Sequence, residues 1–590
     1  MKSFFSFVCL AITLVSAAAA QVVQHPDIAV EELRAHVSYL ASAALKGRKP
    51  GTPGADSSAA YIREELRQAG VTLLGNDGFQ SFEITTGIKA TTECRIRIDG
   101  QDGMLDKDFR PISFSGNEAI SAPVVWAGYG FDFEKDKSSW RDYEGLDVAG
   151  KWVIILRGSP DDKSGDYDPF IPLRVKALAA KDRGAAGIMF VSGPAANPED
   201  KLVELVFQQQ DTPMDIPVIS VRRTIAEKLL AGKSIGELEA ALNREKAPVR
   251  AECSGEFEAL VDLIPQRITA HNVVGFVQGS DPVLKDEYVL IGAHYDHLGM
   301  GGPGSGSRRP DTSAVHNGAD DNASGTAAAI EVIERIAASR SDIRRSVVVA
   351  LFTAEEMGLL GAKEFTRNPP LDLTKARLMC NLDMVGRMDT ARSLSIGGVG
   401  TAVGLQELVQ DAANRHGVRP SMSPEGFGPS DHAAFYAKDI PVLFFFTGVH
   451  DDYHTPDDDA DRLNYEGHKL VSDLVFDIVR DAANRDGALA FQEAGPKSRP
   501  EGSRRFKVTL GIMPDVSSSD GKGLKADAVM KGRPADLAGM KKGDIIVAME
   551  GKPVTGVYDY MSRLAEFTPG QRISIEVLRG SEKVVLIVEL

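Results

Sequence analysis

Histidine and carboxylate side chains stand beside apolar stretches in five segments of the second half of the chain. They are His294 with Asp296, Asp320 with Asp321, Glu355 with Glu356, Asp383, and His454. Each segment alone is weak evidence, because a histidine at a strand end is usually a surface residue and an aspartate before a helix usually caps it. Together, two imidazoles and three carboxylates can hold two divalent ions with one carboxylate bridging them. Nitrogen and oxygen ligands without cysteine suit zinc in a catalytic site, and cobalt or manganese would also fit.

Most of these side chains follow stretches that are predicted to be buried strands. The predicted strands cover 288–291, 346–352 and 441–446, and helices are predicted over 325–337 and 468–483. Strands this apolar are typical of a sheet that helices cover on both faces, and such α/β sheets bind their ligands at the strand ends. The pattern therefore predicts a large α/β core whose strand ends gather the polar residues.

Three of the segments allow more specific expectations. The two-residue alternation of a strand puts His294 and Asp296 on one face, where the carboxylate can accept the second ring N–H of the imidazole. Glu355 and Glu356 leave the end of an apolar strand, where they can splay to give one metal ligand and one free base. Asp383 lies in a stretch apolar enough to be buried, and a buried charge requires a cation nearby.

Composition and charge narrow the class of protein. The chain has 590 residues, 43% hydrophobic and 25% charged, as in ordinary soluble domains. A formal net charge of −16 argues against nucleic acid or an anionic membrane as the main partner.

Residues 1–20 contain Lys2, an apolar run and three alanines before Gln21, which is the layout of a signal peptide. No later apolar run is long enough to span a membrane, so we expect an exported protein, either periplasmic or secreted.

The rest of the chain divides into smaller units. Helical spacing predicts helices over 30–40 and 59–69. From about 120 to 250, strands and helices alternate without clustered histidines or carboxylates, which predicts an α/β module without chemistry of its own. A polar stretch rich in proline and glycine predicts a linker before a C-terminal unit of short strands. Three cysteines follow the signal peptide; Cys380 is interpreted as a buried thiol, and pairing of Cys94 with Cys253 stays open.

On these residues, the segment 272–483, with a helical start over 29–75, resembles the zinc aminopeptidases of peptidase family M28. The resemblance implies a mixed sheet with helices on both faces. It also implies a pair of zinc ions held by His294, Asp321, Glu356, Asp383 and His454.

The same resemblance implies individual roles. Asp321, four residues before Gly325, is the bridging residue in place of Asp320. Relatives have a cis peptide bond after the bridging residue, which implies one between Asp321 and Asn322. Glu355 is the base, and Asp296 orients His294.

Other residues near the five segments match no ligand position. His297, His316 and His450 are interpreted as loop residues, and Asp431 and His432 as structural.

Two further resemblances complete the predicted organisation. Residues 147–153, 184–187 and 216–218 are similar to a protease-associated (PA) domain, inserted into the peptidase domain. The C-terminal unit resembles a PDZ domain whose carboxylate-binding loop contains Leu510, Gly511 and Ile512. The predicted boundaries are a signal peptide at 1–20, peptidase residues 21–115 and 259–487, a PA domain at 116–258, a linker at 488–503 and a PDZ domain at 504–590.

The predicted function is that of an exported aminopeptidase. It would hydrolyse the first peptide bond of peptides with a free amino terminus, through a water activated by two zinc ions, with Glu355 as base and then acid. The PDZ groove would capture the carboxylate end of a peptide by strand addition. Two alternatives stay open. A glutaminyl-cyclase-like acyltransferase would close a ring without water, and a transferrin-receptor-like ectodomain would bind partners without catalysis.

Overall fold

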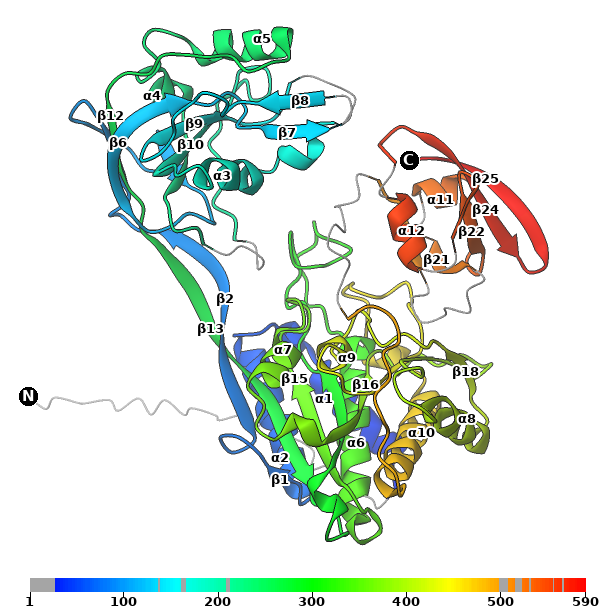
Figure 1. Ribbon diagram of the computed structural model, residues 1–590. Coiled ribbons are helices and arrows are strands. Elements are labelled where there is room, and N and C mark those ends of the chain that lie inside the picture. The colour runs from blue at the N-terminus through cyan, green and yellow to red at the C-terminus, as the bar shows by residue number, and fades with distance from the viewer. Residues whose placement is uncertain are drawn as a thin grey trace, which may run out of the picture. The chain divides into compact units, whose positions relative to one another are not determined.

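The computed structural model describes residues 27–135, 138–160, 166–207, 213–497, 508–514, 523–529, 532–554, 557–564 and 567–590. The predicted signal peptide and residues 498–503 of the predicted linker lie outside the described residues. The chain divides into one unit formed by residues up to Phe82 and from Thr269 onward, and a second formed by Glu83–Ile268. Strands β2 and β13 pair with each other and carry the chain between the two units (Figure 1).

A nine-stranded mixed sheet forms the centre of the first unit. Its order is β1-β13-β15-β14-β16-β19-β17-β18, with β2 paired to β13. The strands are β1 Thr72–Leu73, β2 Phe79–Ala90, β13 Leu263–Val277, β14 Tyr288–His294, β15 Ser346–Phe352, β16 Ala376–Leu382, β17 Ser393–Gly397, β18 Arg419–Met422 and β19 Val442–Phe446. The four central strands, β15, β14, β16 and β19, are parallel to one another, so their carboxyl ends meet at one edge.

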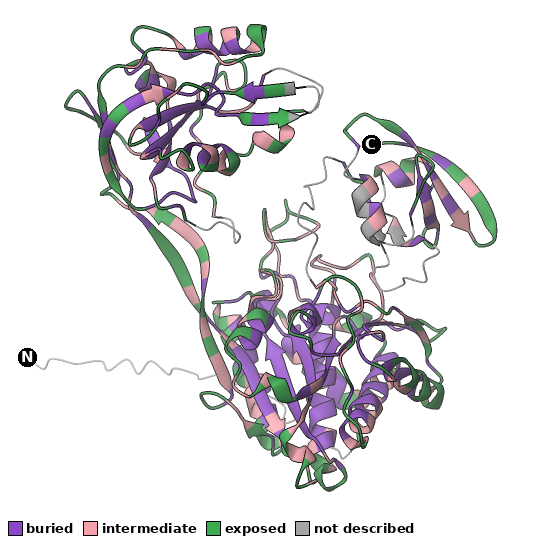
Figure 2. Ribbon diagram, in the orientation of Figure 1, coloured by how far each residue is buried: buried purple, intermediate pink, exposed green. Residues whose placement is uncertain are grey.

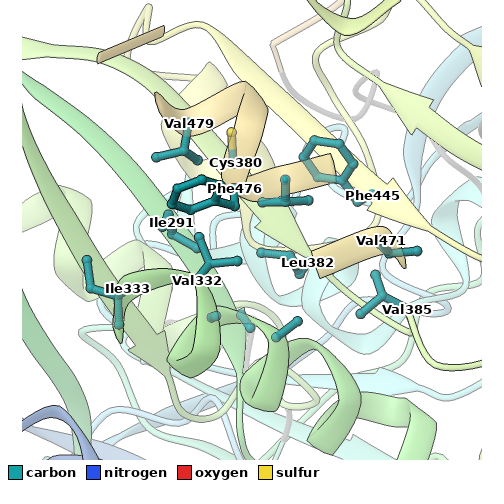
Figure 3. Packing of buried hydrophobic residues seen from close by; sticks show 14 of the residues in the cluster. Ile291, Val332, Ile333, Cys380, Leu382, Val385, Phe445, Val471, Phe476 and Val479 are labelled. Atoms are coloured by element: carbon teal, nitrogen blue, oxygen red, sulfur yellow. The ribbon is translucent and has the colours of Figure 1, made fainter. Parts of the chain in front are cut away.

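Helices cover both faces of this sheet, as the apolar strands predict. They are α1 Val30–Leu40, α2 Pro53–Gln68, α6 Gly325–Ala338, α7 Leu360–Arg367, α8 Leu405–His416, α9 His432–Tyr436 and α10 Tyr465–Asn484. Alternate strand residues enter two different cores. Ile291 and Cys380 pack with Val332 of α6 and Phe476 of α10 (Figure 3), whereas Leu290 and Met379 belong to the core that includes α7 and α9. Figure 2 shows these strands buried along their length.

The inserted unit contains an eight-stranded sheet of order β4-β3-β12-β6-β9-β10-β11-β5. Its strands are β3 Arg95–Ile98, β4 Gln101–Gly103, β5 Phe109–Pro111, β6 Ala119–Trp126, β9 Trp152–Leu156, β10 Gly187–Val191, β11 Val218–Val221 and β12 Glu256–Leu260. A hairpin of β7 Asp132–Lys135 and β8 Ser138–Arg141 and helices α3 Leu173–Lys181, α4 Arg223–Glu227 and α5 Ile235–Glu245 complete it.

The structural boundary of this unit differs from the boundary predicted at 116 and 258. Strands β3 and β5 pair with β12 and β11 of the inserted unit, so the unit extends over 83–268. Short strands do not reveal their pairing partners in sequence.

The described cysteines, Cys94, Cys253 and Cys380, are all free, so the pairing left open for Cys94 and Cys253 is not formed.

The C-terminal residues form a smaller sheet with a core of their own. Its strands are β20 Ile512–Pro514, β21 Leu524–Val529, β22 Ile545–Met549, β23 Lys552–Pro553, β24 Arg572–Arg579 and β25 Glu582–Glu589, with helices α11 Pro534–Leu537 and α12 Val557–Leu564. Among the described residues, no helix has the length and hydrophobicity required to cross a bilayer.

Candidate metal centre

Three backbone features deliver the polar side chains to the edge where the parallel strands end. His294 is the last residue of β14, and Asp383 directly follows β16. After β15, Ala354 adopts φ 56°, so the strand alternation stops before Glu355. The segment Ala319–Ser324 leads into α6, and the peptide bond between Asp321 and Asn322 is cis, as the resemblance implied.

One group of ligand atoms surrounds the Nε2 atom of His294. This nitrogen lies 3.4 Å from Asp321 Oδ1 and 3.5 Å from Asp383 Oδ1. The other ring nitrogen, Nδ1, lies 3.3 Å from the carbonyl oxygen of Asp296 and 3.7 Å from its Oδ1 atom. Asp296 thus lies beside the second ring nitrogen of His294, with its backbone carbonyl nearer than the carboxylate that was expected to accept the ring N–H.

A second group uses the other oxygen of Asp321. His454 Nε2 lies 3.1 Å from Asp321 Oδ2 and 3.2 Å from Glu356 Oε2. His297 Nδ1 is joined to Glu356 Oε1 by a 2.8 Å hydrogen bond and lies 3.8 Å from Asp321 Oδ2. Asp321 therefore has one oxygen in each group, and all five residues predicted as ligands come together.

His297, interpreted from sequence as a loop residue that matches no ligand position, lies in the loop after β14. Its side chain is buried in the second group. The strand alternation could not place His297 in this group, because the residue lies three positions beyond the end of β14. His450 also has a specific neighbour, since its Nε2 lies 3.2 Å from Asp320 Oδ2.

Glu355 lies beside the first group. Its Oε2 atom is 4.0 Å from His294 Nε2, and its side chain is 12% exposed. The backbone N–H of Glu355 donates to Asp296 Oδ1 at 3.1 Å. The two glutamates therefore splay as predicted, with Glu356 among the imidazoles of the second group and Glu355 free of that contact.

Charge and burial perturb these groups strongly. Burial, with smaller contributions from Glu356 and Asp431, raises the pKa of Glu355 well above its usual range against the opposing effect of His294. Burial opposes protonation of His454, but Glu356 and Asp321 outweigh it and raise the pKa of this imidazole to about 11. Burial likewise opposes protonation of His294, whose pKa Asp383 and Glu355 nevertheless raise. The carboxylates thus draw positive charge to this site.

The donor set fits divalent metal ions. The ligand atoms of His294, Asp321 and Asp383 all lie within 4.8 Å of one another, as do those of His297, Asp321 and Glu356. Imidazole nitrogens and carboxylate oxygens are the ligands that zinc takes in catalytic sites. A divalent cation would supply the positive charge that protonated imidazoles otherwise provide.

Buried side chains hold the loops that carry the ligands, and the sequence did not reveal them. Asp458 Oδ2 accepts hydrogen bonds from the backbone N–H groups of Asp320 and Asp321, at 2.9 and 3.0 Å. Asn322 Oδ1 accepts from the N–H of Gly325 and of Met384. These bonds join the start of α6 to the end of β16.

Arg48 is a second such residue. It is fully buried and donates to the carbonyl oxygens of Leu40, Tyr295, Asn317 and Gly318 at 2.6–2.9 Å. The guanidinium of Arg48 therefore links the loop after β14 and the loop before α6 to the segment between α1 and α2.

Replacing Arg48 by methionine should lower the free energy of unfolding of the unit that contains the nine-stranded sheet by about 4 kcal/mol. The substitution leaves buried carbonyl groups without donors, at about 1–3 kcal/mol each, and part of that cost will be relieved by local rearrangement. Urea unfolding followed by circular dichroism measures the loss. Tryptophan fluorescence is an internal reference, because all three tryptophans, Trp126, Trp140 and Trp152, lie in the inserted unit. Exposed Lys46→Met is the control, and an equal effect of both variants would contradict the prediction.

An apolar pocket opens beside the two metal-ligand groups. Met384, Phe444, Phe446, Val449 and Tyr453 line it together with Glu355 and Asp383. Tyr453 stacks on His454 with ring centroids 3.9 Å apart. This lining was not predicted from sequence, because its residues come from the loop after β16, from β19 and from the loop after β19.

The predicted carboxylate-binding loop of the C-terminal unit lies at the start of β20. Leu510 and Ile512 are buried, and Gly511 between them has φ 71°. The N–H of Gly511 donates to Thr509 Oγ1 at 3.1 Å, and the carbonyl of Leu510 accepts from the N–H of Ala535. This loop is therefore anchored to α11.

Comparison with protein families matches three parts of the chain. Residues 272–479 match peptidase family M28, residues 120–229 match the PA domain, and residues 508–590 match the PDZ domain. The order of the three is the order that the sequence predicted.

Curated relatives and solved structures are also similar to this chain. The aminopeptidase YwaD of Bacillus subtilis is 24% identical over 459 residues, which cover 75% of this chain and 83% of the relative. A probable leucine aminopeptidase 2 of Aspergillus oryzae is 23% identical over 501 residues, covering 78% and 87%. Among solved structures, an aminopeptidase from Aneurinibacillus sp. strain AM-1 aligns with a TM-score of 0.44 at 22% identity, covering 79% of this chain and 97% of that one.

Proposed function

We propose that this chain, a zinc-dependent aminopeptidase of peptidase family M28 with a PA domain and a PDZ domain, removes amino-terminal residues with a pair of zinc ions and with Glu355 as base. The observation that carries the proposal is the position of Asp321. Its two oxygens face two separate sets of imidazole and carboxylate ligands, which is the arrangement that a bridging ligand requires. His294, Asp321 and Asp383 would hold one ion, and Asp321, Glu356 and His454 the other.

Zinc in such a site lowers the pKa of a water molecule and polarises a carbonyl group. Glu355 stands beside the ligands without belonging to either metal-ligand group, so its carboxylate is free to accept a proton from the attacking water. It then donates that proton to the leaving amine, so that one side chain serves as base and acid in turn. Asp296 Oδ1 accepts a hydrogen bond from the backbone N–H of Glu355, and the backbone carbonyl of Asp296 faces Nδ1 of His294. Asp296 would thereby hold both residues in position.

The apolar pocket supports a preference for substrates. Met384, Phe444 and Phe446 border the space beside Glu355 and Asp383, where the first side chain of a peptide would lie during hydrolysis. Burying a leucine or phenylalanine side chain there would contribute about 1.5–3 kcal/mol. We therefore propose peptides that begin with an apolar residue as substrates.

A panel of aminoacyl p-nitroanilides tests the proposal. We expect leucine and phenylalanine derivatives to be hydrolysed faster than glutamate or lysine derivatives, and acetyl-leucine p-nitroanilide to be resistant because it has no free amine. Treatment with a chelator should abolish activity, and added zinc should restore it, with zinc content measured on the same samples. Cyclisation of an amino-terminal glutamine without hydrolysis would favour the cyclase alternative. A folded protein without zinc and without activity would favour the receptor alternative.

The first residues support export of the enzyme. A basic residue, an apolar run and small residues before Gln21 form the pattern of a signal peptide, so we propose a periplasmic or secreted enzyme. Amino-terminal sequencing of the mature protein should begin near Gln21. Recovery of Met1 or Lys2 in the exported fraction would contradict cleavage.

The C-terminal domain is proposed to capture the carboxylate end of peptide substrates. Its loop at Leu510, Gly511 and Ile512 precedes an edge strand, and edge strands in PDZ domains bind peptides by strand addition. Deletion of residues 504–590 should raise KM for peptides long enough to reach both sites and leave KM for leucine p-nitroanilide unchanged. The domain has its own core, so the remaining peptidase should fold. An unchanged KM for long peptides would exclude this role.

A further inference from the structure

A second set of buried metal-ligating side chains lies among three helices of the peptidase domain, apart from the ligands described above. His36 of α1, Glu65 of α2 and Glu334 of α6 each place a ligand atom within 4.8 Å of the other two. Glu331, one turn before Glu334 on α6, has its Oε1 atom 3.3 Å from His36 Nε2. All four side chains are buried, with exposures between 0 and 9%. Three ionisable groups thus lie in the interior at a spacing that allows them to share one ion, and a fourth, Glu331, faces the imidazole.

The ligand atoms of two of these side chains lack hydrogen-bond partners. His36 Nε2 and Glu331 Oε1 are fully shielded and make no hydrogen bond, although they face each other. Their residues are 0 and 3% exposed. Burying such groups without a hydrogen bond is costly. A cation bound between them would offset this cost.

The other ring nitrogen of His36 is already occupied. Nδ1 lies 2.7 Å from the hydroxyl oxygen of Tyr61, which is one turn before Glu65 on α2. When Nδ1–H donates to Tyr61, Nε2 presents its lone pair to the carboxylates. Histidines that bind metals in proteins commonly have this arrangement, with the second ring nitrogen donating to a neighbouring oxygen.

The electrostatics of Glu65 show how this imidazole acts on the cluster. Burial raises the pKa of the Glu65 carboxyl, His36 lowers it, and Glu64 and Glu331 raise it further. One imidazole and three carboxylates match the preference of Zn²⁺ and Mn²⁺ for nitrogen and oxygen ligands.

We infer that His36, Glu65, Glu331 and Glu334 form a structural binding site for one divalent cation of the Zn²⁺ or Mn²⁺ type. The ion joins α1 and α2 to α6. Because α6 begins directly after the segment that carries Asp321, the site stabilises the helix that supports the proposed catalytic centre, without taking part in catalysis.

The experiment counts metal ions in the full-length chain. Protein is stripped with a chelator, dialysed against Zn²⁺ or Mn²⁺, and analysed by inductively coupled plasma mass spectrometry. Glu65→Gln and His36→Gln should each bind one ion fewer than the unsubstituted protein, and both should retain hydrolysis of leucine p-nitroanilide. Glu64→Gln is the matched control, because Glu64 is the neighbour on α2 that bonds Arg67 and Gln68 at the surface, and its ion count should not change.

A second measurement separates this site from the proposed catalytic ions. In an Asp321→Asn background, added Zn²⁺ should still raise the melting temperature by several degrees, since an ion that binds only the folded state stabilises it. The further change Glu65→Gln should abolish that rise. Equal ion counts in the unsubstituted protein, Glu65→Gln and His36→Gln would overturn the inference, as would a melting temperature of the Asp321→Asn protein that does not respond to Zn²⁺. Neither result depends on whether the protein hydrolyses peptides.

Discussion

Glu355→Gln should lower kcat for leucine p-nitroanilide by about 10²–10⁴-fold, the usual contribution of a general acid and base, while zinc content stays unchanged. The amide has almost the same size as the carboxylate but cannot accept a proton from water. Glu355 Oε2 lies 4.0 Å from His294 Nε2, and Glu355 belongs to neither set of metal-ligating atoms. Its loss should therefore leave both sets intact.

The neighbouring residue provides the matched comparison. Glu356 lies 3.2 Å from His454 Nε2 and 2.8 Å from His297 Nδ1, so Glu356→Gln removes a ligand. That variant should lose zinc as well as activity. Steady-state kinetics and zinc analysis on the same preparations distinguish the two roles. Near-normal kcat in Glu355→Gln, or loss of zinc from it, would show that the base is another residue.

The gathering of the proposed ligand residues could be predicted from sequence because a parallel sheet brings its strand ends to one edge. His294 ends one strand that is recognisable by composition, and Glu355 and Glu356 follow another. Asp383 was expected only in a buried apolar stretch, which the structure shows to be β16. Asp383 is 14% exposed and lies beside His294, which agrees with the expectation that a charge in an apolar stretch requires a partner. The assignment of Asp321 over Asp320 came from the family resemblance. The structure adds a geometric reason, because the two carboxylate oxygens of Asp321 face different histidines, His294 and His454.

The supporting residues could not be predicted because they act over long separations in sequence. Arg48 contacts Tyr295 and Asn317, about 250 residues away, through backbone carbonyls that carry no signature in the sequence. Asp458 holds Asp320 and Asp321 through backbone N–H groups in the same way. The cluster around His36 could not be predicted for a related reason. Its residues come from three separate helices, and the sequence does not show that these helices pack against one another.

Asp321→Asn should remove both zinc ions of the catalytic centre and lower kcat/KM by at least about 10³-fold, because metal ions provide several kcal/mol of charge stabilisation in such reactions. Asn keeps the size of Asp but replaces one oxygen with an NH₂ group, which cannot bind a cation. Asp321 Oδ1 lies 3.4 Å from His294 and Oδ2 3.1 Å from His454. Whichever oxygen is replaced, one set loses a ligand and the charge shared by both sets disappears.

Asp383→Asn is the comparison that separates a bridging ligand from a terminal one. Asp383 faces His294, 3.5 Å away, and belongs to the first set alone, so this variant should lose one ion and keep the ion held by Glu356 and His454. Zinc per chain, measured after dialysis against a zinc buffer, should therefore fall by two in Asp321→Asn and by one in Asp383→Asn. Equal losses in the two variants would mean that Asp321 serves a single ion. Its two oxygens would then be near both histidines only because the site is crowded, and the paired-metal mechanism would lose its basis.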